Sequence, residues 1–327
     1  MKLLVIGDKA RAARYTPNTP MVERTEVVVA PRGTANKDLL ALAGDADFIL
    51  ADAISPVDAE LIAHMPNLKL IHSEGVAFNA IDCAAARERG ISVCNNAGMN
   101  AAAVAEQAIM LMLMCLRTAV AGDAAVRAGQ QIQFKERRMV EGIKELGDCT
   151  VGLIGFGAIA RATAERLVPW GCTVLYNKRT PLDADEERAL GVTFASQEEI
   201  ARTCDIVSLH TPVTPETTNL VDAKFLALMR PDAFLINTAR GEVVDQVALA
   251  EAIEAGRIAG AGMDTLSPEP VTTDHPLLTM RADCASKVVL SPHIGGVTEG
   301  LFRRVYAHVW ENIARVERGE RPTNVVN

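Results

Sequence analysis

Three stretches of the sequence each place chemically active side chains directly after an apolar run. INTARGEVVD places Arg240 after AFLIN, AGMDTLSPEP places Asp264 and Glu269 after AGAG, and SPHIGG places His293 after VVL. In open α/β sheets, ligands bind outside the carboxyl ends of the strands. If the three runs are strands of one sheet, these side chains could converge on a single point.

An arginine, a histidine and a carboxylate at one point can handle a 2-oxo acid. A guanidinium binds the acid's carboxylate through two parallel hydrogen bonds, and an imidazole exchanges a proton with the oxo oxygen. A nearby carboxylate holds that imidazole and favours its charged form. Taken singly, Arg240 could bridge surface acids, Glu269 could be a loop residue between two prolines, and His293 could cap another element.

A glycine motif favours the catalytic interpretation. TVGLIGFGAIARATAERL contains a strand-like run, then Gly155, Gly157 and Ala160 in a G-x-G-x-x-A arrangement, then a helical pattern. The first glycine makes a tight turn, the second lets the backbone approach a pyrophosphate, and alanine still allows close packing of helix on strand. The N–H groups of Ala158 and Ile159 would face the phosphates at the positive end of the helix.

The next expected strand ends in LYNKRT, where an NAD-binding site usually presents an acid to the ribose hydroxyls. Here Asn177 and Lys178 occupy that place, and Arg179 and Thr180 follow. Positive charge and hydrogen-bond donors suit a 2′-phosphate. The missing acid and the added cations therefore favour NADP(H) over NAD(H). The alternative is that these residues form a solvated charged loop that does not bind the coenzyme.

Alternating strand-like and helical patterns indicate two α/β units with parallel sheets. In the first hundred residues, helix candidates such as 58–65 and 80–89 separate the runs KLLVI, EVVVA, DFILA, LKLIH and ISVC. After an apolar helix predicted over 101–120, which we expect to be buried and shared between the two units, a second series follows: TVGLI, TVLY, VTF, DIVSLH, AFLIN, AGAGMD and VVL.

The last helix, predicted over 299–318, has no strand of its own to cover, so we expect it to complete the first unit and make that domain discontinuous.

The composition argues against nucleic-acid-binding and membrane proteins. A net charge of −8 among 327 residues argues against a nucleic-acid surface or an anionic membrane patch. Glu106 and Gln107 argue against a membrane span in the apolar helix.

Seven cysteines without a C-x-x-C pair fit neither a disulfide framework nor a thiolate metal site, and no metal is expected. They are typical of buried thiols in a reducing compartment. The opening MKLLVIGD goes directly into a strand-like run, which is not the pattern of a secretory signal. We therefore expect a cytoplasmic protein.

The chain resembles the D-isomer-specific 2-hydroxyacid dehydrogenases over nearly its whole length. The resemblance rests on the order and spacing of GVAFNAID (75–82), NNAGMNAAAVAEQA (95–108), GLIGFGAIAR (152–161), LHTPVTPETTNLV (209–221), NTARGEVVD (237–245), MDTLSPEP (263–270) and SPHIGGVTE (291–299). It implies a Rossmann-type coenzyme domain over 101–290, inserted in a flavodoxin-like substrate domain formed by 1–100 and 291–327. It also implies an active-site cleft between the domains and a homodimer.

Matched position by position, Arg240 resembles the residue that binds the substrate's carboxylate and carbonyl, His293 the acid/base, and Glu269 its partner. The backbone of Gly75, Val76 and Ala77 resembles the loop that receives the substrate carboxylate. The resemblance also implies a set of coenzyme contacts: Gly155, Phe156, Gly157, Ala158, Ile159, Asn177, Lys178, Arg179, Thr180, His210, Thr211, Pro212, Thr217, Thr238, Ala239, Arg240, Asp264, His293 and Gly295.

Some positions depart from the family pattern. Phe78 and Asn79 stand where relatives often carry other residues, and HIGGVT lacks an aromatic that some members place beyond the histidine. Glu269 argues against the formate-oxidising branch. The sequence leaves glyoxylate, hydroxypyruvate, pyruvate, bulkier oxo acids and phosphorylated hydroxy acids open as substrates. A dinucleotide-sensing protein similar to the family's transcriptional corepressors is the alternative from another class of function.

Overall fold

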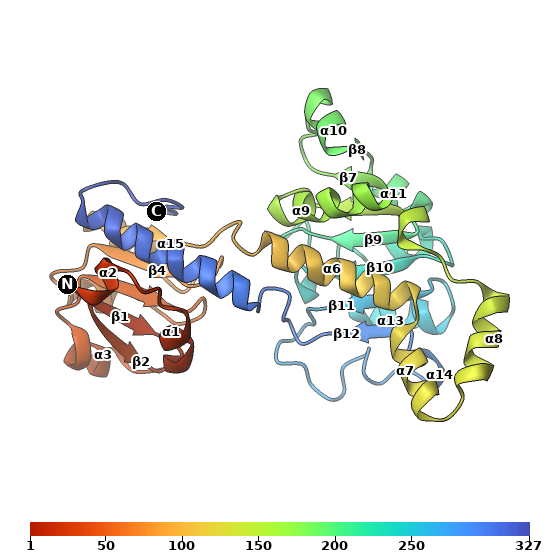
Figure 1. Cartoon of the computed structure of the whole chain (residues 1–327), viewed down its shortest axis with the longest axis horizontal. Coiled ribbons are helices and arrows are strands. Elements are labelled where there is room, and N and C mark those ends of the chain that lie inside the picture. Colours follow the sequence, from red (N-terminus) through yellow and green to blue (C-terminus); the bar gives the residue numbers. More distant parts are fainter. The chain divides into compact units, whose positions relative to one another are not determined.

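The computed structural model describes residues 1–327, and they form two compact units (Figure 1). The first consists of Met1–Asn100 and Thr298–Asn327, and the second of Ala101–Val297. The sequence-based boundary at Ser291 therefore differs from the structure by seven residues. The segment after β12 stays with the second unit because the N–H of Ser291 bonds to Met263 O at 2.9 Å and that of Gly295 bonds to Asp264 at 2.9 Å.

The first unit is built on a five-stranded parallel sheet in the order β2-β1-β3-β4-β5. This order is that of flavodoxin-like folds. The apolar runs form strands because helices cover both faces of the sheet, which buries every residue of β3 and β4. The strands are β1 (Lys2–Ile6), β2 (Glu26–Ala30), β3 (Phe48–Ala51), β4 (Leu70–Ser73) and β5 (Ser92–Cys94).

The C-terminal helix completes the first unit, at the place where the sequence suggested it. Helix α15 is amphipathic, and Leu301, Val305, Tyr306, Val309 and Ile313 on its apolar face pack against one side of the sheet. The other helices of this unit are short. They are α1 (Lys9–Tyr15), α2 (Pro20–Glu23), α3 (Asn36–Ala43), α4 (Ala59–Ala63) and α5 (Cys83–Glu88), and α15 spans Glu299–Glu317.

The second unit contains a seven-stranded parallel sheet in the order β12-β11-β10-β9-β6-β7-β8. The order reverses between β9 and β6, as it does in Rossmann-type folds, so the predicted fold class is confirmed. Its strands are β6 (Thr150–Ile154), β7 (Thr173–Asn177), β8 (Val192–Phe194), β9 (Ile206–Leu209), β10 (Phe234–Asn237), β11 (Gly260–Met263) and β12 (Val288–Leu290).

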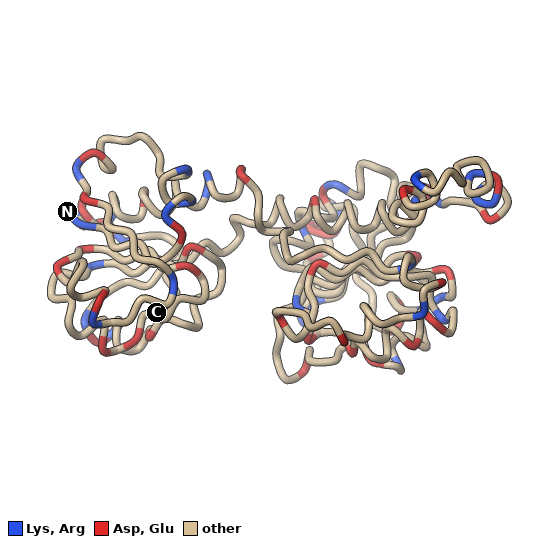
Figure 2. The backbone as a smooth tube through the Cα atoms, turned by 90° about the horizontal axis from the view of Figure 1, so that it is seen from below, with Lys and Arg blue, Asp and Glu red and all other residues tan.

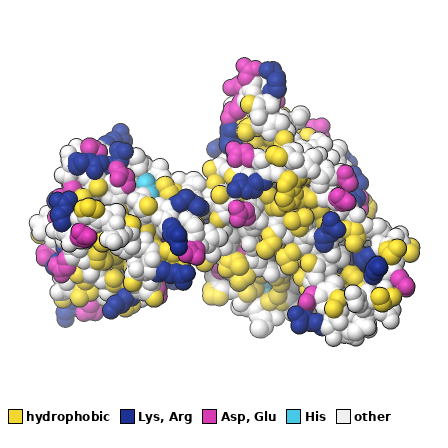
Figure 3. All heavy atoms as spheres, in the orientation of Figure 1, with side chains coloured by type: hydrophobic (Ala, Val, Ile, Leu, Met, Phe, Trp, Pro, Cys, Tyr) yellow, Lys and Arg dark blue, Asp and Glu magenta, His cyan; other side chains and the backbone are white.

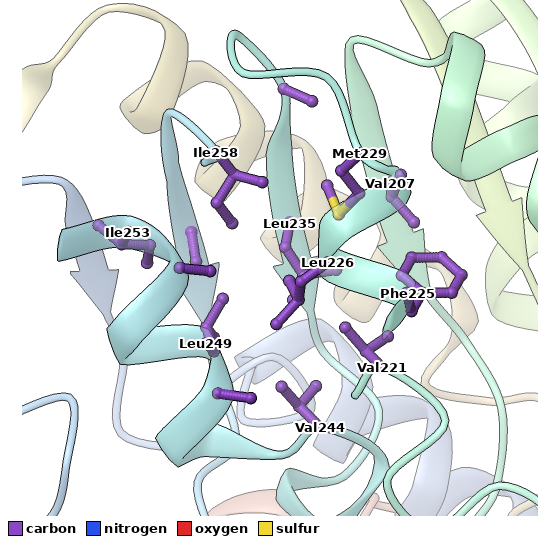
Figure 4. Close-up of a cluster of buried hydrophobic side chains, with 14 of the residues drawn as sticks. Val207, Val221, Phe225, Leu226, Met229, Leu235, Val244, Leu249, Ile253 and Ile258 are labelled. Atoms are coloured by element: carbon purple, nitrogen blue, oxygen red, sulfur yellow. The ribbon is translucent and has the colours of Figure 1, made fainter. Parts of the chain in front are cut away.

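Helices cover both faces of this sheet, and each layer has its own apolar core. Figure 4 shows one of them, where Phe225 and Leu226 of α12 (Ala223–Leu228) and Leu249 of α13 (Gln246–Glu254) meet Leu235 of β10. The opposite face packs against α6 (Ala101–Leu116) and α9 (Ala158–Leu167). The remaining helices are α7 (Ala119–Arg127), α8 (Gln131–Glu141), α10 (Ala184–Leu190), α11 (Gln197–Thr203), α14 (Ala282–Ala285), and the 3₁₀ turns η1 (Leu146–Asp148), η2 (Val168–Trp170) and η3 (Gly241–Val243).

The single helix predicted over 101–120 is wrong. Helix α6 ends at Leu116, Thr118 adopts a left-handed conformation with φ of 48°, and α7 continues at an angle of 56° to α6. No single helix of this chain has both the length and the apolar character needed to span a membrane. Helices α6 and α7 together would have them by length and composition alone, but the two are bent relative to each other. Helices α7 and α8 contain no buried residue and project from the unit as an arm (Figure 1).

Charges of both signs are interspersed over both units (Figure 2). The seven cysteines are free thiols, and six of them are buried. Burial raises the pKa of Cys94, Cys115 and Cys204 to about 12, so these thiols stay protonated and unreactive at neutral pH.

Candidate active site

The glycine loop of the second unit has the local geometry that a dinucleotide requires. Gly155 follows β6 with φ of +86°, and a Cβ there would lie 2.6 Å from the carbonyl oxygen of His210. Only glycine combines that dihedral with so close an approach. A Cβ on Gly157 would meet nothing within 4 Å, and Ala160, in the first turn of α9, is fully buried. The open side of the loop therefore leads to the first N–H groups of α9.

The start of α9 is an uncapped helix N-terminus. Gly157 is the N-cap residue and provides no side chain to accept the first N–H groups of the helix, which include those of Ala158 and Ile159. Phe156 is buried and packs against Tyr176 in a tilted arrangement, with ring centroids 4.5 Å apart. Free N–H groups and the positive end of the helix dipole together make an anion site.

Buried polar atoms without a partner lie in the segments assigned to coenzyme contact. His210 Nδ1, Thr211 Oγ1 and Thr238 Oγ1 are buried and bond to no protein group. Native proteins rarely leave such atoms unpaired, so they call for a polar ligand. Burial lowers the pKa of His210 to about 4, and its Nε2 lies 3.0 Å from Ser208 Oγ. The neutral ring thus offers Nδ1 to a ligand, and these residues fit a dinucleotide.

The segment after β7 contains the groups proposed to select the coenzyme. Asn177 uses both ends of its amide within the protein: Nδ2 donates to Ala195 O at 2.9 Å, and Oδ1 accepts from Gln197 Nε2 at 3.3 Å. Lys178 is half-buried, Arg179 is exposed, and neither forms an ion pair. Residues 177–180 thus present cations and contain no acid, although Glu216 lies near enough for the charge of Arg179 to help lower the pKa of Glu216, after its hydrogen bond to Thr214.

Two loops that follow β9 and β10 are fixed by local hydrogen bonds. In the first, Thr217 Oγ1 donates to Pro212 O at 2.6 Å. In the second, Asn237 at the end of β10 ties the turn by donating to Arg240 O at 2.8 Å and accepting from the N–H of Ala239 at 3.0 Å. These contacts hold the backbone of the segments in which Thr211 and Thr238 have unpaired hydroxyls.

Arg240 is exposed and forms no ion pair. Its Nη1 donates to the carbonyl oxygen of Ala239 at 2.7 Å, and most of its donors remain available. The following Gly241 lies so close to the loop after β11 that a Cβ would come within 2.3 Å of the carbonyl carbon of Leu266. That close approach fixes the backbone beside the guanidinium.

The structure brings two of the predicted catalytic residues into direct contact. His293 Nδ1 lies 2.9 Å from Oε1 and 2.9 Å from Oε2 of Glu269. Both side chains are partly exposed, at 38% for His293 and 57% for Glu269. Because Nδ1 donates to the carboxylate, Nε2 is the nitrogen left for proton exchange. His293 also has φ of +55°, a conformation that is uncommon outside glycine and is concentrated at functional sites.

Asp264 holds the loop that carries His293. It is 2% exposed, and its Oδ1 accepts from Ser291 Oγ at 2.6 Å, Gln107 Nε2 at 3.1 Å and the N–H of Ile294 at 3.1 Å. Its Oδ2 accepts from the N–H of Gly295 at 2.9 Å. Sequence reasoning assigned no role to Gln107 or Ser291, although a glutamine in an apolar helix is a signal that a buried partner is needed.

Gln246 and His275, to which the sequence analysis assigned no role, hold the loop that carries Glu269. Gln246 Oε1 accepts from the N–H of Ser267 at 3.2 Å, and its Nε2 donates to Ser267 O at 2.9 Å. His275 Nε2 donates to the same Oε1 at 3.0 Å, and its Nδ1 accepts from the N–H of Leu277 at 3.2 Å. Burial lowers the pKa of His275, which keeps the ring neutral as this pattern requires.

In the first unit, the predicted carboxylate loop follows β4. The carbonyls of Gly75, Val76 and Ala77 all accept hydrogen bonds from the protein, whereas the N–H groups of Val76 and Ala77 donate to no protein group. A Cβ on Gly75 would lie 2.7 Å from the Cβ of Ala53, so glycine is required at the turn. Adjacent free N–H groups of this kind bind anions.

Comparisons with known proteins identify the family of the chain. Residues 109–295 match the sequence model of the D-isomer specific 2-hydroxyacid dehydrogenase NAD binding domain. The glyoxylate reductase of Thermococcus litoralis is 36% identical over 300 residues, which cover 91% of this chain and 87% of that protein. The D-3-phosphoglycerate dehydrogenase of Mycobacterium tuberculosis is 34% identical over 330 residues, covering 100% of this chain and 59% of that protein.

A solved structure agrees over the full length. The crystal structure of D-lactate dehydrogenase with NAD+ from Lactobacillus jensenii superposes with a TM-score of 0.86 at 27% identity, covering 100% of both chains. All three proteins are named as enzymes, which supports an enzyme over a sensing protein. The motif order, the Rossmann-type unit and these matches lead to one conclusion: the chain belongs to the D-isomer specific 2-hydroxyacid dehydrogenase family and is an oxidoreductase that uses a nicotinamide coenzyme.

Proposed function

We propose that the protein reduces a small 2-oxo acid to the D-2-hydroxy acid, with His293 as the acid/base. The observation that carries the proposal is the contact between His293 and Glu269, in the same unit as the dinucleotide loop. A bound nicotinamide supplies the hydride for such a reduction. His293 Nε2 gives a proton to the oxo oxygen, and Glu269 stabilises the charged ring at Nδ1.

Arg240 binds the carboxylate and the oxo oxygen of the substrate. Its guanidinium is exposed and unpaired, and its planar fork fits a carboxylate with two parallel hydrogen bonds. In the first unit, the adjacent free N–H groups of Val76 and Ala77 form an anion-binding turn that also fits a carboxylate. A substrate without a carboxylate loses these contacts.

The coenzyme is NADP(H) in preference to NAD(H). Support comes from Lys178 and Arg179, which follow β7 without an ion-pair partner, and from Asn177, whose side chain is already engaged by Ala195 and Gln197. Thr180 adds a hydroxyl at the same edge. A ribose 2′-phosphate would receive charge-assisted hydrogen bonds there, whereas a ribose hydroxyl would meet no acid.

The protein forms a homodimer through α6 and the α7–α8 arm. Figure 3 shows hydrophobic side chains gathered over the face of the unit where α6 lies, and these include Met110, Leu113, Met114 and Trp170. The arm exposes Val126, Ile132, Met139 and Val140. Exposed apolar side chains gathered on one surface are typical of a protein–protein interface.

A panel of 2-oxo acids tests the proposed function. Glyoxylate, hydroxypyruvate, pyruvate, a branched and an aromatic oxo acid, and phosphohydroxypyruvate are each incubated with NADH and with NADPH, and coenzyme oxidation is followed by absorbance. Oxidation with at least one unphosphorylated acid, faster with NADPH, is expected. Oxidation with none of the acids would contradict the proposal.

A further inference from the structure

The loop that follows β4 is held from behind by one asparagine. Asn96 Nδ2 donates to the carbonyl oxygens of Ser73 at 2.9 Å and Glu74 at 3.1 Å. The backbone N–H of Asn96 donates to the carbonyl oxygen of Gly75 at 2.9 Å. Asn96 is 1% exposed, so these bonds form away from solvent, and a single residue fixes three consecutive peptide groups.

The next two carbonyls of the loop are also engaged. Asn95 Nδ2 donates to Val76 O at 2.8 Å, and Ser73 Oγ donates to Ala77 O at 2.6 Å. Five consecutive carbonyls, from residue 73 to residue 77, therefore point toward donors within the unit. Each peptide plane is rigid and joins a carbonyl to the N–H of the next residue. The backbone N–H of Asn96 therefore fixes the Val76 N–H through Gly75 O, and Asn95 fixes the Ala77 N–H through Val76 O, while the Asn96 side chain holds the two peptide groups that lead into them.

The asparagines are themselves held by the C-terminal part of the chain. His308 on α15 donates from Nδ1 to Asn96 Oδ1 at 2.8 Å, and its Nε2 lies 2.8 Å from Thr323 Oγ1. The N–H of Asn95 donates to Asn324 O at 3.2 Å. Because Asn96 Oδ1 accepts from His308, the amide is oriented so that both Nδ2 hydrogens face the loop carbonyls.

We propose that Asn96, held by His308, is a positioning residue that fixes the peptide groups leading into the Val76 and Ala77 N–H groups and thereby influences the affinity for the substrate carboxylate. The proposal rests on the proposed function of those two N–H groups. It makes α15 and the C-terminal segment part of substrate recognition, although neither has to touch the substrate. Binding sites need such supporting contacts because small displacements of donors weaken directed hydrogen bonds.

Steady-state kinetics of Asn96→Ala test the proposal, with KM measured separately for the 2-oxo acid and for the coenzyme, and Ki for the carboxylate inhibitor oxamate. We expect KM for the oxo acid and Ki for oxamate each to rise about tenfold, since the loop loses two side-chain hydrogen bonds. The coenzyme KM should stay near that of the wild type, because Asn96 lies in the other compact unit from the glycine loop.

His308→Leu keeps Asn96 and removes only the hydrogen bond that holds its Oδ1. This variant should also raise the oxo-acid KM and the oxamate Ki, by a smaller factor. It provides the test if Asn96→Ala does not fold. Asn67→Ala is the matched control. Asn67 also donates from Nδ2 to a carbonyl, that of Asp45 at 3.1 Å, but in the loops that precede β3 and β4. The control should leave KM and Ki unchanged.

Unchanged oxo-acid KM and oxamate Ki in both Asn96→Ala and His308→Leu would overturn the proposal, as would equal changes in oxo-acid and coenzyme KM. These results leave the proposed function standing as long as His293→Ala abolishes turnover. If His293→Ala retains turnover, the proposed function itself fails. The two failures are therefore distinguishable.

Discussion

The carboxylate of Asp264 accepts a 2.9 Å hydrogen bond from the backbone N–H of Gly295, two residues beyond the proposed acid/base. The same carboxylate accepts from Ile294, Ser291 and Gln107. It thus joins the end of β11, the loop after β12 and helix α6. The position of the His293 imidazole depends on this buried carboxylate as well as on Glu269.

Asp264→Asn should therefore lower stability and turnover together. An asparagine keeps the size of the side chain but turns an amide N–H₂ toward one of the present donors, which leaves a buried donor unpaired. The free energy of unfolding should fall by about 1–3 kcal/mol, and turnover should fall about tenfold or more as the His293 loop shifts. Urea unfolding and initial rates measure the two effects.

The control for this change is Asp283→Asn, because Asp283 is exposed and pairs only with neighbouring residues of its own segment. That variant should behave like the wild type in both assays. Wild-type stability and turnover in Asp264→Asn would contradict the role assigned to the buried carboxylate.

We expect the coenzyme preference to depend on the exposed Arg179. Arg179→Ala should raise KM for NADPH about tenfold or more, the range expected for losing a charge-assisted hydrogen bond, while KM for NADH changes little. Arg188→Ala is the control, because Arg188 is exposed on α10 and pairs with Asp185. Equal changes in KM for the two coenzymes would remove the argument for the 2′-phosphate.

The first unit should lose stability as the pH falls below neutrality. Burial, opposed by the bond to Ser73 O, lowers the pKa of His72 to about 3, and Nε2 accepts from Asn312 Nδ2 at 3.1 Å. Burial also lowers the pKa of His308. Since both rings are neutral in the folded protein, the unfolded chain takes up protons first. The stabilisation is complete above pH 6.5 and decreases toward about pH 3.

Urea unfolding between pH 7.5 and 5 measures this dependence in a range where carboxylates contribute little. Each neutral histidine adds a slope of up to about 1.4 kcal/mol per pH unit. His72→Gln should be less stable than the wild type at pH 7.5 and should show a flatter decline toward pH 5. A decline as steep as that of the wild type would show that His72 is not responsible.

The arm and the α6 face should control the oligomeric state. Met139 is 74% exposed on α8, and Met110 is 40% exposed on α6. Met139→Glu and Met110→Glu should each shift the protein from dimer to monomer in light scattering coupled to size-exclusion chromatography, because a buried unpaired charge is costly. Val247→Glu, at an exposed position on α13, should remain dimeric. Dimers in all three variants would exclude this surface as the interface.

Much of the fold could be predicted from the sequence because the strands are buried on both faces. Each of the twelve apolar runs forms a strand, since a parallel sheet between two helix layers requires near-continuous apolar residues. The break at Thr118 was missed. The apolar helical pattern continues through Val120, and neither proline nor glycine marks the turn.

Site residues that take part in the chemistry could be predicted from the sequence, whereas residues that hold the site through hydrogen bonds to distant segments could not. Glu269 and His293 could be named from their places after two strands, and the structure pairs them. Gln107, Gln246 and Asn96 could not be named, because their roles depend on partners at least 20 residues away in the sequence. A buried amide such as Gln107 can signal that a polar partner is needed, but only the fold shows which carbonyl or carboxylate that partner is.

The most direct measurement of the central claim is turnover of His293→Ala with the best 2-oxo acid of the panel, together with coenzyme binding followed by fluorescence. Removing the imidazole removes the proton donor, so kcat should fall by roughly 10²–10⁴. Coenzyme binding should stay near that of the wild type, since the glycine loop is unchanged. A His293→Ala enzyme that binds coenzyme and turns over at the wild-type rate would contradict the account.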